Sequence, residues 1–259
     1  MKAVILAGGF GSRLSEETDI RPKPMVEIGG KPIIWHIMKQ YARHGINDFV
    51  ICLGYKAEYV KRYFIDYSQT SKDFQIDLMT GEIKTFQADI ENWKINLLDT
   101  GLTTMTGGRI KKVIEQLKIS ETFCLTYGDG LSDVNIKESI KFHRAHGKLA
   151  TVTAVTPPGR FGILEIDDNR KVSGFREKIV SDQYRINGGF FVLEPSIIDY
   201  IADDQTSWEQ SPLQELSLDG QLLAWEHNGF WHPMDTLGDK MHLQKLWDEG
   251  DAPWSMQSD

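Results

Sequence analysis

Apolar runs and helically spaced apolar positions alternate along the first part of the chain. Residues 2–6 (KAVIL) and 48–53 (DFVICL) are apolar and rich in β-branched side chains, which is typical of buried parallel strands. Residues 32–43 carry apolar side chains three and four positions apart, open with a proline and stop before Gly45, so they predict a helix. A second helix is predicted over 56–64. Strands that alternate with helices in this way indicate a doubly wound sheet.

The pattern changes over residues 66–106, which are polar and contain no long apolar run. We interpret this stretch as an insertion of short strands and loops. Beyond it the earlier patterns return and predict helices over 110–117, 136–146, 197–201, 213–218 and 239–249, and strands over 123–127, 150–155, 161–166, 172–177, 190–193, 224–227 and 231–234. The expected fold class is therefore α/β, a Rossmann-like doubly wound mixed sheet with helices on both faces, a small stranded insertion and a C-terminal extension.

Composition and charge argue against several classes of protein. The chain has 259 residues and a formal net charge of −8, whereas a nucleic-acid-binding protein usually carries a basic excess, so we expect no nucleic-acid partner. No stretch approaches the roughly eighteen apolar residues of a membrane span, and the apolar run in the opening MKAVILAGG is too short for an export signal. We therefore expect a cytoplasmic protein without a membrane partner. Cys52 and Cys124 lie in apolar runs and are expected to be buried thiols.

A glycine-rich segment over 8–11 (GGFG) directly follows the first predicted strand, and Arg13 comes two residues later. Glycine backbones approach a ligand closely, so their N–H groups can cradle an anion, while arginine offers a rigid fork for phosphate oxygens. Lys23 stands between two prolines, which stiffen the backbone that carries it. Taken alone, the glycines are equally typical of a plain strand-to-helix turn, and Lys23 of a solvated turn. The dinucleotide fingerprint and the Walker A spacing are both absent.

Two aspartates follow predicted strands. Asp129 stands between two glycines after the strand over 123–127, and Asp235 lies in the segment HPMDT after a short apolar run. Open α/β sheets bind ligands at the carboxyl ends of their strands, and Mg²⁺ prefers one or two carboxylates together with phosphate oxygens and water. An isolated aspartate is more often a turn or cap residue, and we interpret Asp133 as the cap of the helix over 136–146.

Together, GGFGSRL over 8–14 and PKPM over 22–25 resemble the signature of the sugar nucleotidyltransferase family, a G-x-G-x-R-L loop followed by P-K-P. The resemblance implies an enzyme whose glycine loop wraps the phosphates of a nucleotide and whose signature lysine contacts the phosphates at the point of transfer. Phe10 and Ser12 replace the leucine and threonine that are common in the family. Neither replacement removes a hydrogen-bond donor or a cation.

Further segments resemble the branch of this family that joins CTP to α-D-glucose 1-phosphate and so makes CDP-glucose. They are WHIMKQYARHGI, LLDTG, MTGGRIK, LTYGDGLSD, PPGRFG, INGGFFVL, WEQSPL and HPMDTLGDK. The site residues that this resemblance implies are, as catalytic residues, Arg13, Lys23 and Asp129; as nucleotide-binding residues, Leu6, Ala7, Gly8, Gly9, Gly11, Ser12, Arg13, Thr104, Gly108, Arg109 and Gly128; as sugar-phosphate-binding residues, Lys23, Gly162, Glu177, Lys178, Asn187 and Gly188; and as ligands of a Mg²⁺ cofactor, Asp129 and Asp235.

The same resemblance implies one nucleotidyltransferase domain over 1–259, with its insertion over about 66–106 and a sugar-binding and C-terminal part over about 150–259. It also implies a homo-oligomer, a trimer or a hexamer. The expected reaction is an in-line attack of the sugar phosphate on the α-phosphate of the nucleotide, in which catalysis comes from positioning and charge neutralisation.

Three alternatives stay open at the level of the sequence. The residues do not show which base is bound, so the same reaction with UTP or dTTP remains an alternative. A non-catalytic protein that senses nucleotide sugars is a second one, although it would be expected to lose the acidic residues or the signature lysine. A NAD-dependent oxidoreductase is disfavoured because it would require the absent dinucleotide fingerprint.

Overall fold

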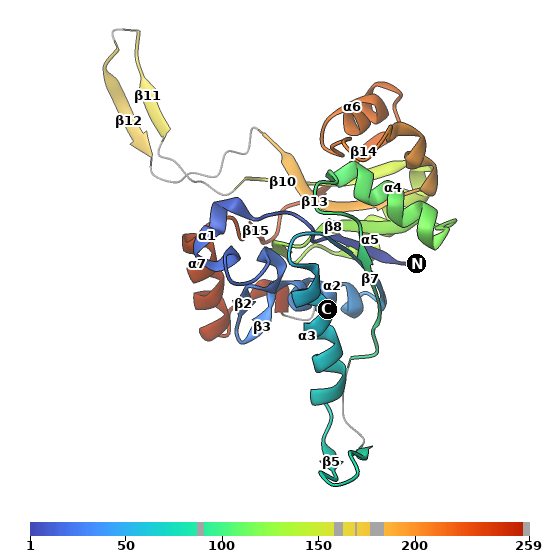
Figure 1. Ribbon diagram of the computed structural model, residues 1–259. Coiled ribbons are helices and arrows are strands. Elements are labelled where there is room, and N and C mark those ends of the chain that lie inside the picture. Colours follow the sequence, from blue (N-terminus) through green and yellow to red (C-terminus); the bar gives the residue numbers. More distant parts are fainter. Residues whose placement is uncertain (87–90, 158–162, 169, 177–183, 256–259) are drawn as a thin grey trace.

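Seven strands form one mixed sheet in the order β14-β10-β13-β8-β1-β4-β7, as the computed structural model shows (Figure 1). The structure describes residues 1–86, 91–157, 163–168, 170–176 and 184–255. The strands of the sheet are β1 (Ala3–Leu6), β4 (Asp48–Leu53), β7 (Lys94–Asp99), β8 (Phe123–Tyr127), β10 (Ala150–Val155), β13 (Ile186–Leu193) and β14 (Leu222–His227). Strand β1 pairs in parallel with β4 and β8, whereas β13 runs antiparallel to β8 and β10.

Helices cover both faces of this sheet. They are α1 (Ser15–Thr18), α2 (Ile33–Arg43), α3 (Ala57–Thr70), α4 (Thr106–Leu117), α5 (Ile136–His146), α6 (Ser211–Leu218) and α7 (Leu237–Asp248), with 3-10 turns η1 (Ser12–Leu14), η2 (Lys23–Met25), η3 (Pro195–Tyr200) and η4 (Pro253–Ser255). Side chains of α2, α3, α5 and α7 enter one core together with Ile5, and side chains of α4 and α6 enter a second core together with Val4. Successive residues of a strand point to opposite faces, so β1 contributes to both cores. The expected fold class is confirmed.

The register of the central strands brings the carboxyl ends of β1 and β8 side by side at one edge of the sheet. Leu6 at the end of β1 lies opposite Tyr127 at the end of β8, and the Gly128 N–H donates to the Leu6 carbonyl over 2.9 Å. A second contact brings in the C-terminal part of the chain, because β15 (Trp231–Pro233) pairs with β9 (Gly130–Ser132). The Met234 N–H then donates to the Asp129 carbonyl over 2.8 Å. The two segments that carry the candidate aspartates therefore meet at this edge.

The remaining short strands form hairpins at the periphery. They are β2 (Glu27–Ile28) with β3 (Lys31–Pro32), β5 (Phe74–Ile76) with β6 (Ile83–Thr85), and β11 (Ile163–Ile166) with β12 (Val172–Arg176). Figure 1 shows the β5–β6 and β11–β12 hairpins as two arms that project from the body. No helix in the described part of the chain is both long and apolar enough to span a membrane.

Several expected elements differ from the structure. Helix α3 runs on to Thr70, and residues 94–99 form β7, the last strand of the main sheet, so the insertion expected over 66–106 is reduced to the β5–β6 hairpin and its connections. An edge strand is only half covered, which is why β7 lacks the long apolar run of its neighbours. The helix expected over 197–201 is the 3-10 turn η3. The cap of α5 is Asn135, which accepts from the Glu138 N–H, whereas Asp133 pairs with His227.

His36 on α2 is buried among aromatic rings in the first core. Its Nε2 lies 2.8 Å from the Ile28 carbonyl and must donate to it, while Nδ1 accepts from the Trp254 indole N–H over 3.4 Å. The Trp247 ring centroid lies 4.9 Å from that of His36. Both ring nitrogens are used by the neutral form, and burial lowers the pKa of His36 to about 4.

This arrangement predicts a loss of stability in mild acid. In the unfolded chain His36 is protonated near pH 6.5, whereas in the folded chain it is protonated only near pH 4. The contribution of neutral His36 to the free energy of unfolding is therefore complete above pH 6.5 and is lost as the pH falls towards 4. The effect amounts to about 3 kcal/mol at most. Urea unfolding at several pH values between 7 and 4.5 should show a shallower pH dependence in His36→Gln than in the wild type. His242→Gln, at an exposed histidine, should keep the wild-type dependence, and equal slopes in all three proteins would contradict the assignment.

Candidate active site

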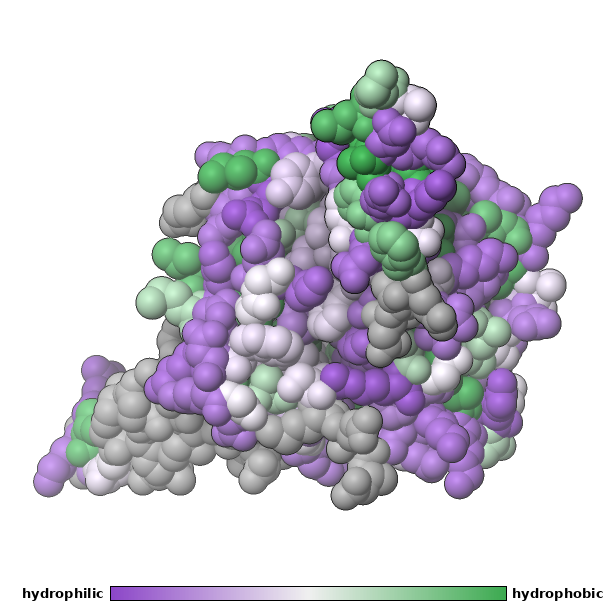
Figure 2. All heavy atoms as spheres, turned by 90° about the horizontal axis from the view of Figure 1, so that it is seen from below, coloured by the Kyte–Doolittle hydropathy of each residue, from purple (hydrophilic) through white to green (hydrophobic). Residues whose placement is uncertain are grey.

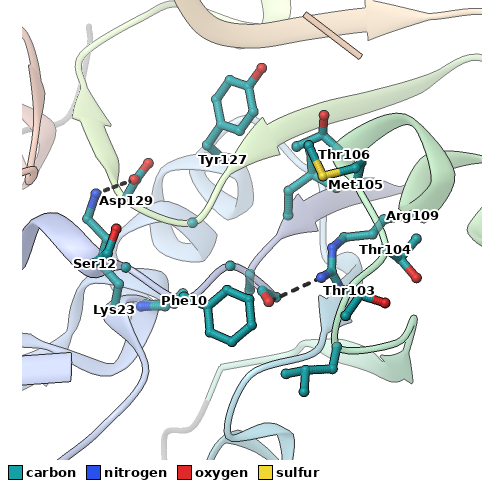
Figure 3. Close-up of a pocket in the computed structure, with 18 of the residues that line it drawn as sticks. Phe10, Ser12, Lys23, Thr103, Thr104, Met105, Thr106, Arg109, Tyr127 and Asp129 are labelled. Carbon is teal, nitrogen blue, oxygen red and sulfur yellow. Dashed lines mark hydrogen bonds and ion pairs between the residues drawn. The ribbon is translucent and has the colours of Figure 1, made fainter. Parts of the chain in front are cut away.

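A cavity of about 390 Å³ opens at the carboxyl ends of β1 and β8 (Figure 3). Five segments build its wall: the glycine loop over 6–12, the turn η2, the loop that leads into α4 with the first turn of that helix, the end of β8 with the residues that follow it, and Asp235 before α7. Ligands of open α/β sheets bind at this edge. The cavity therefore lies where the topology of the sheet expects a ligand.

Lys23 joins the two candidate aspartates inside this cavity. Its Nζ lies 2.6 Å from Asp129 Oδ2 and 2.8 Å from Asp235 Oδ1, across 106 and 212 residues of sequence. Lys23 is only 9% exposed. Burial by itself would lower the pKa of this lysine, but the charges and hydrogen bonds of the two carboxylates outweigh it and raise the pKa above its ordinary value. Lys23 is therefore held as an ammonium between two carboxylates.

The local sequence fixes the backbone on both sides of this contact. Prolines flank Lys23, and Met25 donates its N–H to the Pro22 carbonyl over 2.8 Å to close the turn η2. On the other side, Thr236 and Asp239 form a capping box at the start of α7. The Asp235 N–H donates to Asp239 Oδ2 over 3.1 Å, so the aspartate is held at the end of a capped helix. The backbone that carries Lys23 and Asp235 is thus held in place by local hydrogen bonds and prolines.

Two positions in the glycine loop accept no side chain. A Cβ on Gly8 would lie 2.1 Å from a nitrogen of the Arg109 guanidinium. Gly11 has a φ of +66°, and a Cβ there would lie 2.8 Å from the Thr18 side chain. A Cβ on Gly9, by contrast, would meet no described atom within 4 Å. Gly8 and Gly11 are therefore required by the fold of the loop, while Gly9 leaves open space beside the cavity.

Arg109 anchors this loop from behind. One guanidinium nitrogen donates to the Leu53 carbonyl over 2.9 Å and to Thr100 Oγ1 over 2.6 Å, and the other donates to the Gly8 carbonyl over 3.2 Å. The side chain is buried, and burial lowers its pKa, although not enough to remove the charge of an arginine. Figure 3 shows Arg109 directed at the glycine loop. A positive charge that is satisfied by backbone carbonyls thus forms one end of the cavity.

The structure brings most of the expected residues together. Those that line the cavity are Leu6, Ala7, Gly8, Gly9, Gly11, Ser12, Lys23, Thr104, Arg109, Gly128, Asp129 and Asp235. Gly108 is not among them, because it packs α4 against the backbone of Asp204, where a Cβ would lie 2.6 Å from the Cα. The side chain of Arg13 and all of Gly162, Glu177 and Lys178 lie outside the described residues.

Besides Lys23, two described residues were expected to bind the sugar phosphate, and both lie on β13, beside the cavity wall. Asn187 Oδ1 accepts from the Gly189 N–H over 2.8 Å, and the Gly188 carbonyl accepts from the Trp231 indole N–H over 2.7 Å. Gly189 packs against the ring of Tyr127, which lines the cavity, so closely that a Cβ on Gly189 would lie 2.6 Å from Tyr127 Cδ2. The segment that carries Asn187 and Gly188 therefore contacts the cavity wall at Tyr127.

Sequence reasoning missed four kinds of wall residue. Tyr127, Phe10, Pro24 and the loop residues Leu102, Thr103, Met105 and Thr106 complete the cavity. Tyr127 could have been found from its place at the end of a buried strand, two residues before Asp129. The loop could not, because an irregular segment carries no periodic signal. Glu209, which bonds Tyr127 from outside the cavity, was also missed.

Comparison with known proteins defines the class to which this fold and site belong. The model of the nucleotidyl transferase family matches residues 2–220, and the chain belongs to that family. The chain is 56% identical over 254 residues to the glucose-1-phosphate cytidylyltransferase of Salmonella typhi, with 98% of each chain covered. It is 44% identical over 257 residues to the probable glucose-1-phosphate cytidylyltransferase of Bacillus subtilis, with 99% of this chain and 100% of that one covered.

Solved structures agree on the fold. HddC from Yersinia pseudotuberculosis, complexed with GMP-PN, superposes with a TM-score of 0.70 at 24% identity and covers 95% of this chain and 99% of its own. A UDP-glucose pyrophosphorylase complexed with UDP-glucose superposes with a TM-score of 0.66 at 14% identity and covers 96% and 98% of the two chains. These likenesses are evidence for the architecture alone.

Proposed function

We propose that this chain is a glucose-1-phosphate cytidylyltransferase, which converts CTP and α-D-glucose 1-phosphate into CDP-glucose and pyrophosphate. The observation that carries the proposal is the convergence of the glycine loop, Lys23 and two aspartates on one cavity. Two relatives that bear this name or its probable form match the chain over nearly its whole length. A non-catalytic sensor is disfavoured because the chain keeps all of these charged groups in one place.

The reaction needs charge neutralisation more than proton transfer. A phosphate oxygen of the sugar phosphate attacks the α-phosphorus, the bond from that phosphorus to the bridging oxygen breaks, and pyrophosphate takes the electron pair. The nucleophile is already ionised, so no general base is required. Amides of the glycine loop and the side chain of Arg13 are assigned to the leaving pyrophosphate, and Lys23 to the charge that grows around the α-phosphate.

The two aspartates suit a magnesium ion. Asp129 and Asp235 already place one oxygen each within 2.8 Å of a single cationic nitrogen, so they can converge on one cation. The described residues contain no cluster of three acidic, histidine or cysteine ligands, but Mg²⁺ is commonly held by one or two carboxylates with phosphate oxygens and water. When bound, the ion would supply positive charge to the phosphate oxygens.

The sugar phosphate is assigned to Lys23, Gly162, Glu177, Lys178, Asn187 and Gly188. The close packing of Gly189, which follows Asn187 and Gly188 on β13, against the cavity residue Tyr127 supports the sugar side of this assignment. A cytoplasmic location belongs to the same proposal. Both cysteines, Cys52 and Cys124, are buried free thiols, which suits a reducing compartment.

A homo-oligomer, a trimer or a hexamer, is also part of the proposal. The β5–β6 arm exposes large apolar side chains, namely Phe74, Ile76, Leu78, Met79, Ile83 and Phe86. Met79 is 98% exposed and Leu78 is 87% exposed. Figure 2 views the molecule from the side on which this arm projects and shows apolar surface gathered on it. Exposed apolar patches of this kind mark contacts with other chains.

The substrate proposal predicts a preference among nucleotides. Pyrophosphate release should be measured with α-D-glucose 1-phosphate, Mg²⁺ and each of CTP, UTP, dTTP, GTP and ATP. We expect kcat/KM to be at least about tenfold higher for CTP, because a site that hydrogen-bonds one base edge leaves polar groups unpaired with another. A higher kcat/KM with UTP or dTTP would show that the enzyme uses that base instead. If none of the five nucleotides gave pyrophosphate release, the proposal that the chain is an enzyme of this kind would be wrong.

A further inference from the structure

Glu209 gathers hydroxyl groups from three segments onto one carboxylate. The residue lies in the turn that leads into α6, and its side chain points back to the main sheet. Oε1 accepts a hydrogen bond from the Tyr127 hydroxyl, and Oε2 accepts from Thr106 over 2.6 Å and from Ser207 over 2.8 Å. Tyr127 is 82 residues away in sequence and Thr106 is 103 residues away. The contact is therefore a tertiary one, made by the fold.

Two of these partners belong to different segments of the cavity wall. Tyr127 ends β8 directly before Gly128 and Asp129, and Thr106 opens α4 directly after the loop over 102–105. Both line the cavity. Figure 3 shows the Tyr127 ring between Asp129 on one side and Thr106 and Met105 on the other. Glu209 thus ties the strand end that carries the acidic group to the loop on the nucleotide side.

The hydrogen bonds fix the direction of each hydroxyl. Thr106 Oγ1 accepts from the Trp208 N–H over 2.9 Å and donates to Glu209, so both its donor and its acceptor capacity are used. The Tyr127 hydroxyl has a single proton, which it donates to Glu209 Oε1. The Tyr127 ring also packs edge-on against Phe191, with centroids 6.4 Å apart. The ring is therefore held in one orientation.

The chemistry of the acceptor explains why a carboxylate stands here. Three donors converge on two oxygens, and an ionised carboxylate accepts on both. A glutamine of the same shape has one accepting oxygen and turns its amide donors towards the remaining hydroxyls. A negative charge beside a site for two polyanions also opposes their binding, so the carboxylate carries an electrostatic cost at this place. The three hydrogen bonds that it accepts offset that cost.

We infer that Glu209 is a positioning residue for the nucleotide, which acts through Tyr127 and Thr106 to hold these two segments of the cavity wall at a fixed separation. The inference rests on the proposed function, because it names the substrate whose binding depends on this brace. Thr104 lies in the loop that Thr106 ends, and that loop forms the nucleotide side of the cavity. A loosened brace therefore raises KM for the nucleotide and leaves kcat nearly unchanged.

The test is a double-mutant cycle on Glu209→Gln and Tyr127→Phe, measured by pyrophosphate release with both substrates varied. We expect Glu209→Gln to raise KM for CTP about tenfold, with kcat and the melting temperature near those of the wild type. The double variant should be no worse than Glu209→Gln, because residues that act through one contact are non-additive. Glu215→Gln removes an exposed carboxylate of α6 and should leave every parameter unchanged.

Each other outcome has one meaning. Additive effects of the two substitutions, a wild-type KM in Glu209→Gln, or an equal change in Glu215→Gln would overturn the role of Glu209. If Glu209→Gln does not fold, Tyr127→Phe and Thr106→Val carry the test, and an unchanged KM for CTP in both would overturn it. A wild-type chain that neither binds CTP in calorimetry nor releases pyrophosphate would instead overturn the proposed function.

Discussion

Replacing Lys23 with alanine should lower kcat by about 10²–10³-fold while the chain still folds. The ammonium is held inside the cavity by two carboxylates, and the proposed reaction assigns it to the charge that grows around the α-phosphate. Removal of one preorganised charge-stabilising group from such a site costs about 3–4 kcal/mol of transition-state stabilisation. Steady-state and single-turnover release of pyrophosphate would measure the loss.

Lys141→Ala is the matched control for this prediction. It removes one positive charge from an exposed lysine of α5, whose side chain is 78% exposed, and should leave kcat unchanged. Circular dichroism would establish that both variants are folded. A folded Lys23→Ala protein with near-normal kcat would show that the lysine has no part in the transfer step.

Metal affinity should change in opposite directions in two variants of the same cluster. Mn²⁺ can report on the proposed Mg²⁺ site through its paramagnetic resonance signal. Asp129→Asn should weaken Mn²⁺ binding by about a hundredfold, because it removes a charged ligand. Lys23→Gln should strengthen Mn²⁺ binding in the absence of nucleotide by about tenfold, since the ammonium that occupies the same two carboxylates is gone.

The expected result for Lys23→Gln distinguishes two cases: the lysine and the metal ion compete for the same carboxylate oxygens, or they only lie near each other. If the lysine and the metal use the same oxygens, the gain in Lys23→Gln appears without nucleotide and accompanies a loss of turnover. Unchanged or weaker Mn²⁺ binding in Lys23→Gln would show that the ion lies elsewhere. Full Mn²⁺ affinity in Asp129→Asn would remove Asp129 from the metal site.

The geometry gives the lysine two states with different partners. In the structure its ammonium neutralises Asp129 and Asp235, which would otherwise repel each other inside a partly buried cavity. In the proposed reaction Asp129 and Asp235 would hold a metal ion, which would supply that positive charge, and the Lys23 ammonium would then be available to phosphate oxygens. On this proposal we expect the same residue to stabilise the ligand-free site and to assist the transfer in the loaded one.

The sequence by itself determined the strands and helices that form because of the residues within them. The strands β1, β4, β8 and β10 were predicted because buried parallel strands are continuous apolar runs, and the helices α2 to α7 because their apolar residues recur at helical spacing. The glycine loop and Lys23 were also readable, since glycine and proline act on the backbone where they stand. Edge strand β7 and the 3-10 turn η3 escaped because one is half exposed and the other is too short for a period.

Only the tertiary structure decided how distant residues combine. Asp235 meets Lys23 because β15 pairs with β9, and no pattern near either residue encodes that pairing. Arg109 turned out to hold the backbone of the glycine loop, and Glu209 to join Tyr127 to Thr106. The physical reason is the same in each case. The residue type alone determines which interactions a side chain can make. Which residue it interacts with depends on strand register and helix packing, and these depend on the whole chain.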